Sequence, residues 1–66
     1  MGLTDSERSY MVQLRMEKAF RFLDEAKKMV DMQLWDLAAN RFYYSCFHAA
    51  QGLLLQNGFS AHTHEG

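Results

Sequence analysis

Residues 37–58 read LAANRFYYSCFHAAQGLLLQNG, and the predicted architecture of the chain follows from this stretch. Arg41 is the one formally charged residue between positions 37 and 64. Apolar side chains would lie on every side of a helix built from this stretch, so the helix should be buried on every side. Asn57 followed by Gly58 is typical of a helix end. The sequence therefore predicts a helix over about residues 35–56.

The preceding stretch has the period of an amphipathic helix. Its apolar residues recur in alternating steps of four and three, an a/d pattern, and charged residues occupy the other face. The apolar positions are Val12, Met16, Ala19, Leu23, Ala26 and Val30. Thr4, Asp5 or Ser6 would cap this helix, which we place at about residues 5–32. The turn at residues 31–35 lacks glycine, and residues 57–66 form a tail without periodicity.

The chain has 66 residues, enough for one small domain whose own core is marginal. Proline is absent, and we predict an all-α fold, an antiparallel helical hairpin. The first helix covers only one side of the second, and the remaining apolar surface exceeds what a soluble monomer normally exposes. The second helix therefore needs another copy of the chain or missing sequence. Two such hairpins would assemble as a dimeric four-helix bundle.

Composition narrows the class of protein. The formal net charge is -1, so no general basic field attracts nucleic acid and any such contact would be local. The single Cys46 excludes an internal disulfide, and we expect a buried, inert thiol in a reducing compartment. The N-terminus is polar and charged, unlike a signal peptide, and polar residues interrupt the longest uncharged run. We therefore expect a cytoplasmic protein that does not enter a membrane.

Arg41 and His48 are the candidate catalytic pair. They are seven residues apart, so they project from the same face of one helix, separated by about 10 Å along its axis. Two copies related by a two-fold axis could bring two such pairs around one cleft that suits an RNA phosphodiester. There His48 would act as general acid or base, and Arg41 would hold the phosphate. The alternative is structural: Arg41 pairs with Asp36 or Asp24, and His48 is a satisfied core histidine.

Three neighbours are candidate substrate-binding residues. Asn40, Tyr44 and His48 form a polar strip on the second helix, and Ser45 lies beside it. The alternative for the tyrosine is interface packing with a satisfied hydroxyl. In the tail, His62 and His64 do not have the spacing of a zinc site, so we expect no metal and no cofactor.

The run ANRFYYSCFHAA at residues 39–50, with LLL at 53–55 and Gly58, resembles the N-R-x-Y-Y-x-x-F-H-A-A branch of the HEPN domain family. The sequence THEG at residues 63–66 is similar to the T-H-x-G that follows in that branch, and Trp35 also fits. The resemblance covers about residues 10–66 and implies an α-helical bundle that dimerises. The usual domain is about twice as long, so residues 1–66 resemble its N-terminal half.

The resemblance also implies a function. Many members are RNases or toxins with an arginine, four to six residues, and then a histidine, a spacing that Arg41 and His48 match. Others work beside a minimal nucleotidyltransferase, and some bind nucleotides. The chain departs from active nucleases at Phe42, where they often carry a polar residue. The sequence thus leaves enzyme activity open: a complete domain would be a metal-independent RNase candidate, whereas this stretch alone is expected to be inactive.

Two hypotheses therefore remain. In the first, the chain is a HEPN-type module that dimerises and binds RNA or nucleotide, as a toxin-type RNase component paired with a nucleotidyltransferase. In the second, it is a non-catalytic dimerisation or partner-docking module in which Arg41 and His48 are structural. The spacing of that pair favours the first, and Phe42 favours the second.

Overall fold

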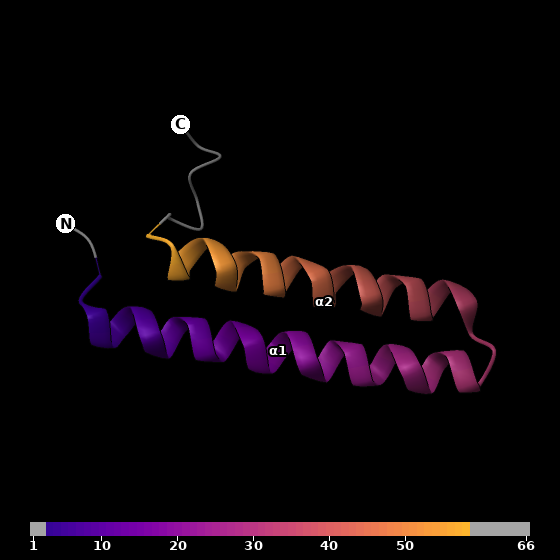
Figure 1. Cartoon of the computed structure of the whole chain (residues 1–66). Coiled ribbons are helices and arrows are strands. Elements are labelled where there is room, and N and C mark those ends of the chain that lie inside the picture. The colour runs from indigo at the N-terminus through magenta and orange to yellow at the C-terminus, as the bar shows by residue number, and fades with distance from the viewer. Residues whose placement is uncertain (1–2, 59–66) are drawn as a thin grey trace.

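The protein is an antiparallel hairpin of two long helices (Figure 1). In this computed structural model, which describes residues 3–58, α1 spans Asp5–Asp31 and α2 spans Trp35–Gln56. The predicted all-α hairpin and both predicted helices are confirmed. Of the predicted tail, Asn57 and Gly58 are described, whereas residues 59–66, including His62 and His64, lie outside the described part.

Of the three candidate caps that the sequence offered for α1, Thr4 is the one that caps the helix. Its hydroxyl accepts a hydrogen bond from the Glu7 backbone N–H at 3.0 Å, and its own N–H donates to Glu7 Oε1 at 2.9 Å. This reciprocal capping box satisfies N–H groups that have no partner within the helix. Asp5 and Glu7 also place negative charge in the first turn, where the helix dipole favours it.

The turn between the helices is a helix-ending motif built without glycine. The Gln33 N–H donates to Val30 O and the Leu34 N–H to Met29 O, each at 2.9 Å. This pattern places Gln33 in the left-handed region, with φ at 60°. α2 then begins at once, with no side-chain cap and with Asp36 in its first turn. It ends at Asn57 and Gly58, as predicted, and Gly58 has φ of 88°.

Small residues line the contact between the two helices. Ala38, Ser45 and Gly52 are buried on α2, and Ala19 and Ala26 are buried on α1; each set is spaced by seven residues. Within the predicted a/d positions of α1, Val12, Met16 and Leu23 are half-buried, whereas Val30 is exposed. A Cβ atom added at Gly52 would lie 3.1 Å from Met16 Sδ and 3.5 Å from Arg15 Cβ. The small side chains therefore let the helices approach closely.

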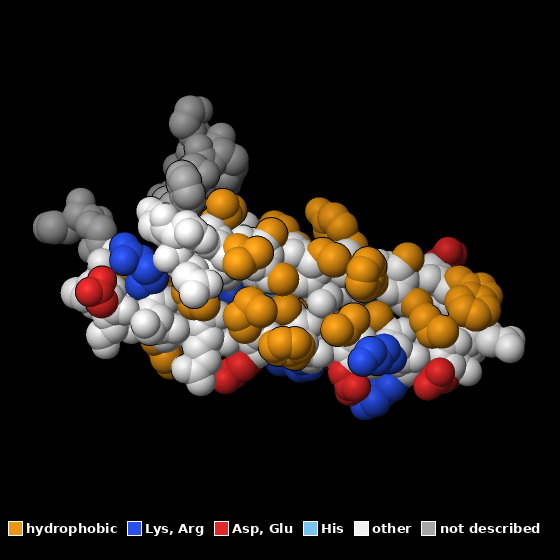
Figure 2. Space-filling view, viewed as in Figure 1, with side chains coloured by type: hydrophobic (Ala, Val, Ile, Leu, Met, Phe, Trp, Pro, Cys, Tyr) orange, Lys and Arg blue, Asp and Glu red, His pale blue; other side chains and the backbone are white. Residues whose placement is uncertain are grey.

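α1 covers only one side of α2, as the sequence indicated. Phe42 and Leu53 of α2 are 55% and 59% exposed, and Phe20 of α1 is also exposed. Figure 2 shows hydrophobic side chains spread along both helices on one face, with charged side chains gathered at the α1 edge. Neither described helix is both long and apolar enough to cross a membrane.

Cys46 corrects an expectation, because its side chain is exposed rather than buried. It follows the buried Ser45 by one residue, and one residue turns a helix by about 100°, so Cys46 points away from α1. Burial of this thiol would need a second partner for α2.

Candidate functional site

The hairpin places Arg41 and His48 beside the small-residue contact. Arg41 lies four residues before the buried Ser45 and His48 three residues after it, and the same steps of four and three lead on to the buried Leu55. Both side chains are half-buried, and each reaches a different residue of α1. Arg41 and His48 therefore lie in one strip along the edge of the helix pair, together with their α1 partners Glu25 and Arg15.

Arg41 pairs with an acidic residue of α1. Its Nε lies 3.0 Å from Glu25 Oε1, and its Nη1 donates a hydrogen bond of 2.8 Å to Asn40 Oδ1. Within the described residues the buried Nε–H makes no aligned hydrogen bond, so the Glu25 contact is an ion pair without that directional bond. The sequence offered Asp24 or Asp36 as the partner. Glu25 follows Asp24 by one residue, which is about 100° around α1, and this rotation directs Glu25 rather than Asp24 towards Arg41.

His48 is held by three residues. Its Nδ1 lies 3.0 Å from Arg15 Nη1. The Phe22 ring stacks on the imidazole, with centroids 5.5 Å apart and planes inclined by 5°. The Phe47 ring meets it edge-on, with centroids 5.4 Å apart. Because these contacts come from both helices, the ring orientation depends on how the hairpin packs.

The surroundings lower the pKa of His48 below its ordinary value of 6.5. Burial is the main cause, because it disfavours the charged imidazolium, and the positive charges of Arg15, Lys18 and Arg21 act in the same direction. The surroundings therefore favour the uncharged form of the His48 imidazole.

The structure separates the three predicted substrate-binding residues. Asn40 accepts a hydrogen bond from Arg41, and the Tyr44 ring packs 5.9 Å from that of Phe22, beside His48. These two therefore lie in the strip. Ser45 lies elsewhere, since it is only 8% exposed and its hydroxyl donates a 2.7 Å hydrogen bond to Ala19 O. Ser45 is therefore part of the contact between the two helices and not of the strip.

Sequence reasoning missed the contribution of α1. By its period, the sequence places the charged residues of α1 on the face away from its apolar positions, yet Arg15 and Glu25 are half-buried and contact α2. One signal was present: Arg15 and Phe22 are seven residues apart, like Arg41 and His48, so the two residues of each pair share a face of their own helix.

Positive charge predominates in the strip. Arg15, Lys18 and Arg21 surround His48, and Arg41 lies two turns away, with Glu25 as the acidic residue in contact. A shallow hollow of about 220 Å³ lies beside it, lined by Met11, Leu14, Arg15 and Lys18. Guanidinium and ammonium groups around a polar imidazole suit an anionic, phosphate-bearing ligand.

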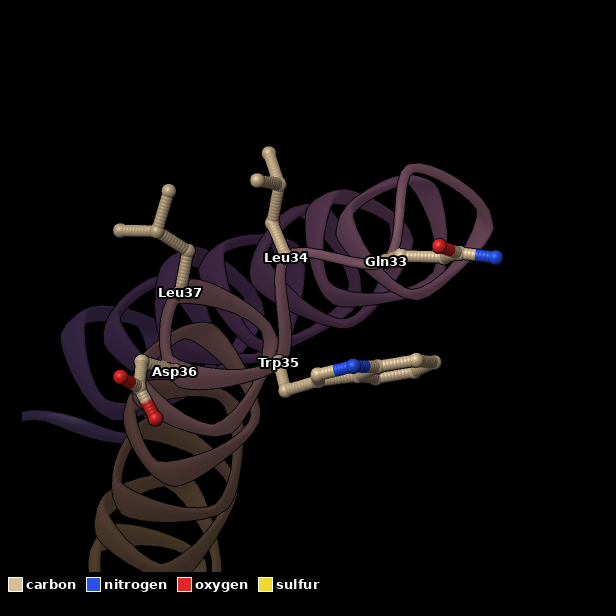
Figure 3. Close-up of a pocket in the computed structure, with 5 residues that line it drawn as sticks. All are labelled: Gln33, Leu34, Trp35, Asp36 and Leu37. Carbon is tan, nitrogen blue, oxygen red and sulfur yellow. The ribbon is translucent and has the colours of Figure 1, made fainter.

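Other features of the described residues suit a ligand less well. A hollow of about 310 Å³ at the turn is lined by residues 33–37, and Figure 3 shows Leu34 and Leu37 pointing to one side of it and Trp35 to another. Asp36 is the charged residue among these five, so an anion would be repelled. Within residues 3–58, no three His, Cys, Asp or Glu side chains gather as metal ligands.

Comparisons with known proteins agree with the sequence pattern. The model of the HEPN domain matches residues 12–66. The chain is 38% identical over 55 residues to a UPF0332 protein of Archaeoglobus fulgidus, covering 83% of this chain and 44% of that protein. It is 31% identical over 61 residues to a UPF0332 protein of Thermotoga maritima, covering 92% and 46%. The chain thus spans less than half the length of these relatives. No solved structure matches it.

Proposed function

Because the chain belongs to the HEPN domain family, we propose that it is a helical module that dimerises and binds RNA or a nucleotide through the strip that carries Arg41 and His48. One observation carries this proposal: two helices bring basic side chains to the same edge of a chain whose net charge is -1. A local concentration of positive charge on a weakly acidic protein favours a phosphate-bearing ligand.

The strip offers the kinds of contact that nucleotides use. Arg41 has guanidinium N–H groups beyond those directed at Glu25 and Asn40, and these are available to a phosphate oxygen. Tyr44 and Phe22 place aromatic rings next to His48, and bases stack on such rings in single-stranded RNA recognition. Phosphate and base contacts would thus come from one edge of the hairpin.

Dimerisation is the second part of the proposal. Phe42 and Leu53 of α2 are more than half exposed, and a second hairpin packed on α2 would bury them. Sedimentation of the wild-type chain should give a dimer that Leu53→Glu dissociates, because the introduced carboxylate would be buried in the interface. The matched control is Tyr10→Glu, since Tyr10 is equally exposed but lies on α1 opposite the buried Ala19. A folded wild-type monomer would contradict this part.

The family also suggests a cellular role. We propose that the module is the RNase component of a toxin-type pair, with a minimal nucleotidyltransferase as its partner. In a metal-independent cleavage, Arg41 would stabilise charge developing on the phosphate, and His48 would interact with a reacting or leaving oxygen. Phe42 is apolar and exposed beside Arg41, where nucleases of the family often carry a polar residue. It therefore contributes no hydrogen bond to such a reaction.

A second function has specific support. Arg41 is paired with Glu25, and His48 is bonded to Arg15 and stacked on Phe22, so both residues already have structural partners. In a non-catalytic dimerisation or partner-docking module these contacts would be their whole role. The two functions differ in what substitution of Arg41 does to ligand binding.

The test is the affinity of the chain for a fluorescently labelled single-stranded RNA, measured by anisotropy. We expect Arg41→Gln to weaken binding about tenfold, the cost of losing a hydrogen bond to a charged group. The control is Lys28→Gln, which removes the same charge from an exposed position in the last turn of α1. Equal affinity of both variants and the wild type, or no binding at all, would favour the non-catalytic module.

A further inference from the structure

We propose that Arg15 is a positioning residue for His48: it holds the imidazole in the Nε2–H tautomer, so that His48 meets a phosphate oxygen as a hydrogen-bond donor. The second half of this statement rests on the proposed function, whereas the first half concerns the hairpin alone. Arg15 was not a site candidate in the sequence, because it lies in the charged part of α1.

The contact between Arg15 and His48 determines the tautomer. An arginine has five N–H donors and no acceptor, so the 3.0 Å contact requires His48 Nδ1 to accept. A neutral imidazole that accepts at Nδ1 carries its proton on Nε2. Within residues 3–58, Nε2 makes no hydrogen bond and is not a buried atom left without one. It therefore remains able to donate to a ligand.

The aromatic contacts fix the plane in which this donor lies. The Phe22 ring is nearly parallel to the imidazole, at 5°, and the Phe47 ring meets it at 75°. One aromatic ring therefore comes from α1 and the other from α2 itself. The two rings fix the plane of the imidazole, and the Arg15 hydrogen bond selects, from the two orientations related by a 180° ring flip, the one with Nδ1 towards Arg15.

The effect of positive charge near His48 can be distinguished from the effect of the Arg15 hydrogen bond. Arg15, Lys18 and Arg21 face it from α1, and on α2 Tyr44 lies one turn away and Arg41 two turns away. Among these groups, Arg15 is the one within hydrogen-bond distance in the described part of the chain. Lys18 supplies a similar positive charge without that bond, which makes it a matched control.

This arrangement has a chemical consequence. Neutral imidazole has a single basic lone pair, and Arg15 occupies it. His48 therefore accepts no proton from a ribose hydroxyl while Arg15 stays in place. In the arrangement that the structure describes, the histidine contributes a donor, and the positive charge near the phosphate comes from the arginines.

The experiment reads the tautomer directly and needs no ligand. Ring ¹⁵N chemical shifts and long-range ¹H–¹⁵N couplings of His48 are measured at pH 7.5 in the 66-residue chain. The wild type should show the Nε2–H tautomer. Arg15→Glu places an acceptor next to Nδ1 and should shift the population to Nδ1–H, whereas Lys18→Glu makes the same change of charge and should keep Nε2–H. Arg15→Lys retains a donor and should also keep Nε2–H.

Two results would overturn the proposal: an Nδ1–H tautomer in the wild type, or the same tautomer in Arg15→Glu and Lys18→Glu. Backbone spectra confirm that each variant folds, and the wild-type and Arg15→Lys measurements remain decisive if Arg15→Glu does not. Failure of the proposed function is a separate result, namely a wild-type chain with the expected tautomer that binds no RNA.

Discussion

At the scale of single residues, Arg41 and His48 have partners of opposite character on α1. Glu25 places a negative charge against Arg41, and Arg15 places a positive charge against His48. If the strip binds a phosphate, as we propose, Glu25 would compete with it for the guanidinium of Arg41, whereas Arg15 would add to the attraction for it. The two ends of the strip should therefore respond differently to substitution.

Glu25→Gln should increase affinity for a phosphate-bearing ligand. Removing the carboxylate charge frees Arg41, and a partly exposed ion pair is worth up to about 1 kcal/mol, so we expect an increase of no more than about fivefold. Anisotropy with labelled RNA measures it. Glu17→Gln is the control, because Glu17 is exposed and bonds to Gln13 on α1, outside the strip. Equal affinities for the two variants would show that Arg41 does not meet the phosphate.

His48 should make folding stability depend on pH in a defined direction. Its pKa in the folded chain lies below 6.5, so in the window beneath 6.5 the unfolded chain binds more protons than the folded one. The free energy of unfolding therefore falls as the pH drops from 6.5 towards the folded pKa, and the full contribution is present above 6.5. Urea unfolding at pH 7.5 and 5.5 measures the change, which should be smaller in His48→Gln. An equal change in both proteins would refute this.

The sequence predicted the Arg41–His48 pair but not its partners, for a geometric reason. Spacing along one helix determines which residues share a face, so seven residues were enough to align these two. Partners across the hairpin depend on register, which the turn sets. Glu25 and Arg41 are each eight residues from Gln33, and Phe22 and Tyr44 are each eleven. Without the position of Gln33, the sequence offered Asp24 or Asp36 as the partner of Arg41 and missed Glu25.

At the scale of the elements, the helix bounds could be predicted because local chemistry determines them. Thr4 and Glu7 form a capping box at one end, and Asn57 with Gly58 ends the other helix. The turn was harder, since the left-handed residue is Gln33 and left-handed positions usually carry glycine. Because α2 has apolar residues on all sides, hydrophobicity did not indicate which face contacts α1. The small residues Ala38, Ser45 and Gly52, spaced by seven, do indicate it.

Gln33→Gly should stabilise the hairpin. A non-glycine residue in the left-handed region costs about 1 kcal/mol, and glycine removes that cost without disturbing the two backbone hydrogen bonds. Urea unfolding should therefore give a free energy of unfolding about 1 kcal/mol higher. Gln13→Gly is the opposite control, because Gln13 lies inside α1 and glycine there should cost about 1 kcal/mol. A loss of stability in Gln33→Gly would contradict the assigned turn.

At the scale of the whole molecule, the hairpin has two different kinds of surface. One edge gathers Arg15, Lys18, Arg41 and His48, and much of the remaining surface of α2 is apolar and exposed. The apolar excess was predictable, because no single helix can cover an all-round apolar partner. The edge that combines side chains of both helices was not predictable, since it forms only when Arg15 and Phe22 of α1 are brought into register with Arg41 and His48 of α2.

An NMR titration with a short single-stranded RNA shows directly whether this edge of the hairpin binds a phosphate-bearing ligand. Binding of RNA at the edge formed by both helices should give saturable shifts in backbone and side-chain signals, largest at Arg15, Lys18, Arg41, Tyr44 and His48. Shifts confined to the apolar face around Phe42 and Leu53, or no shifts at saturating RNA, would contradict it.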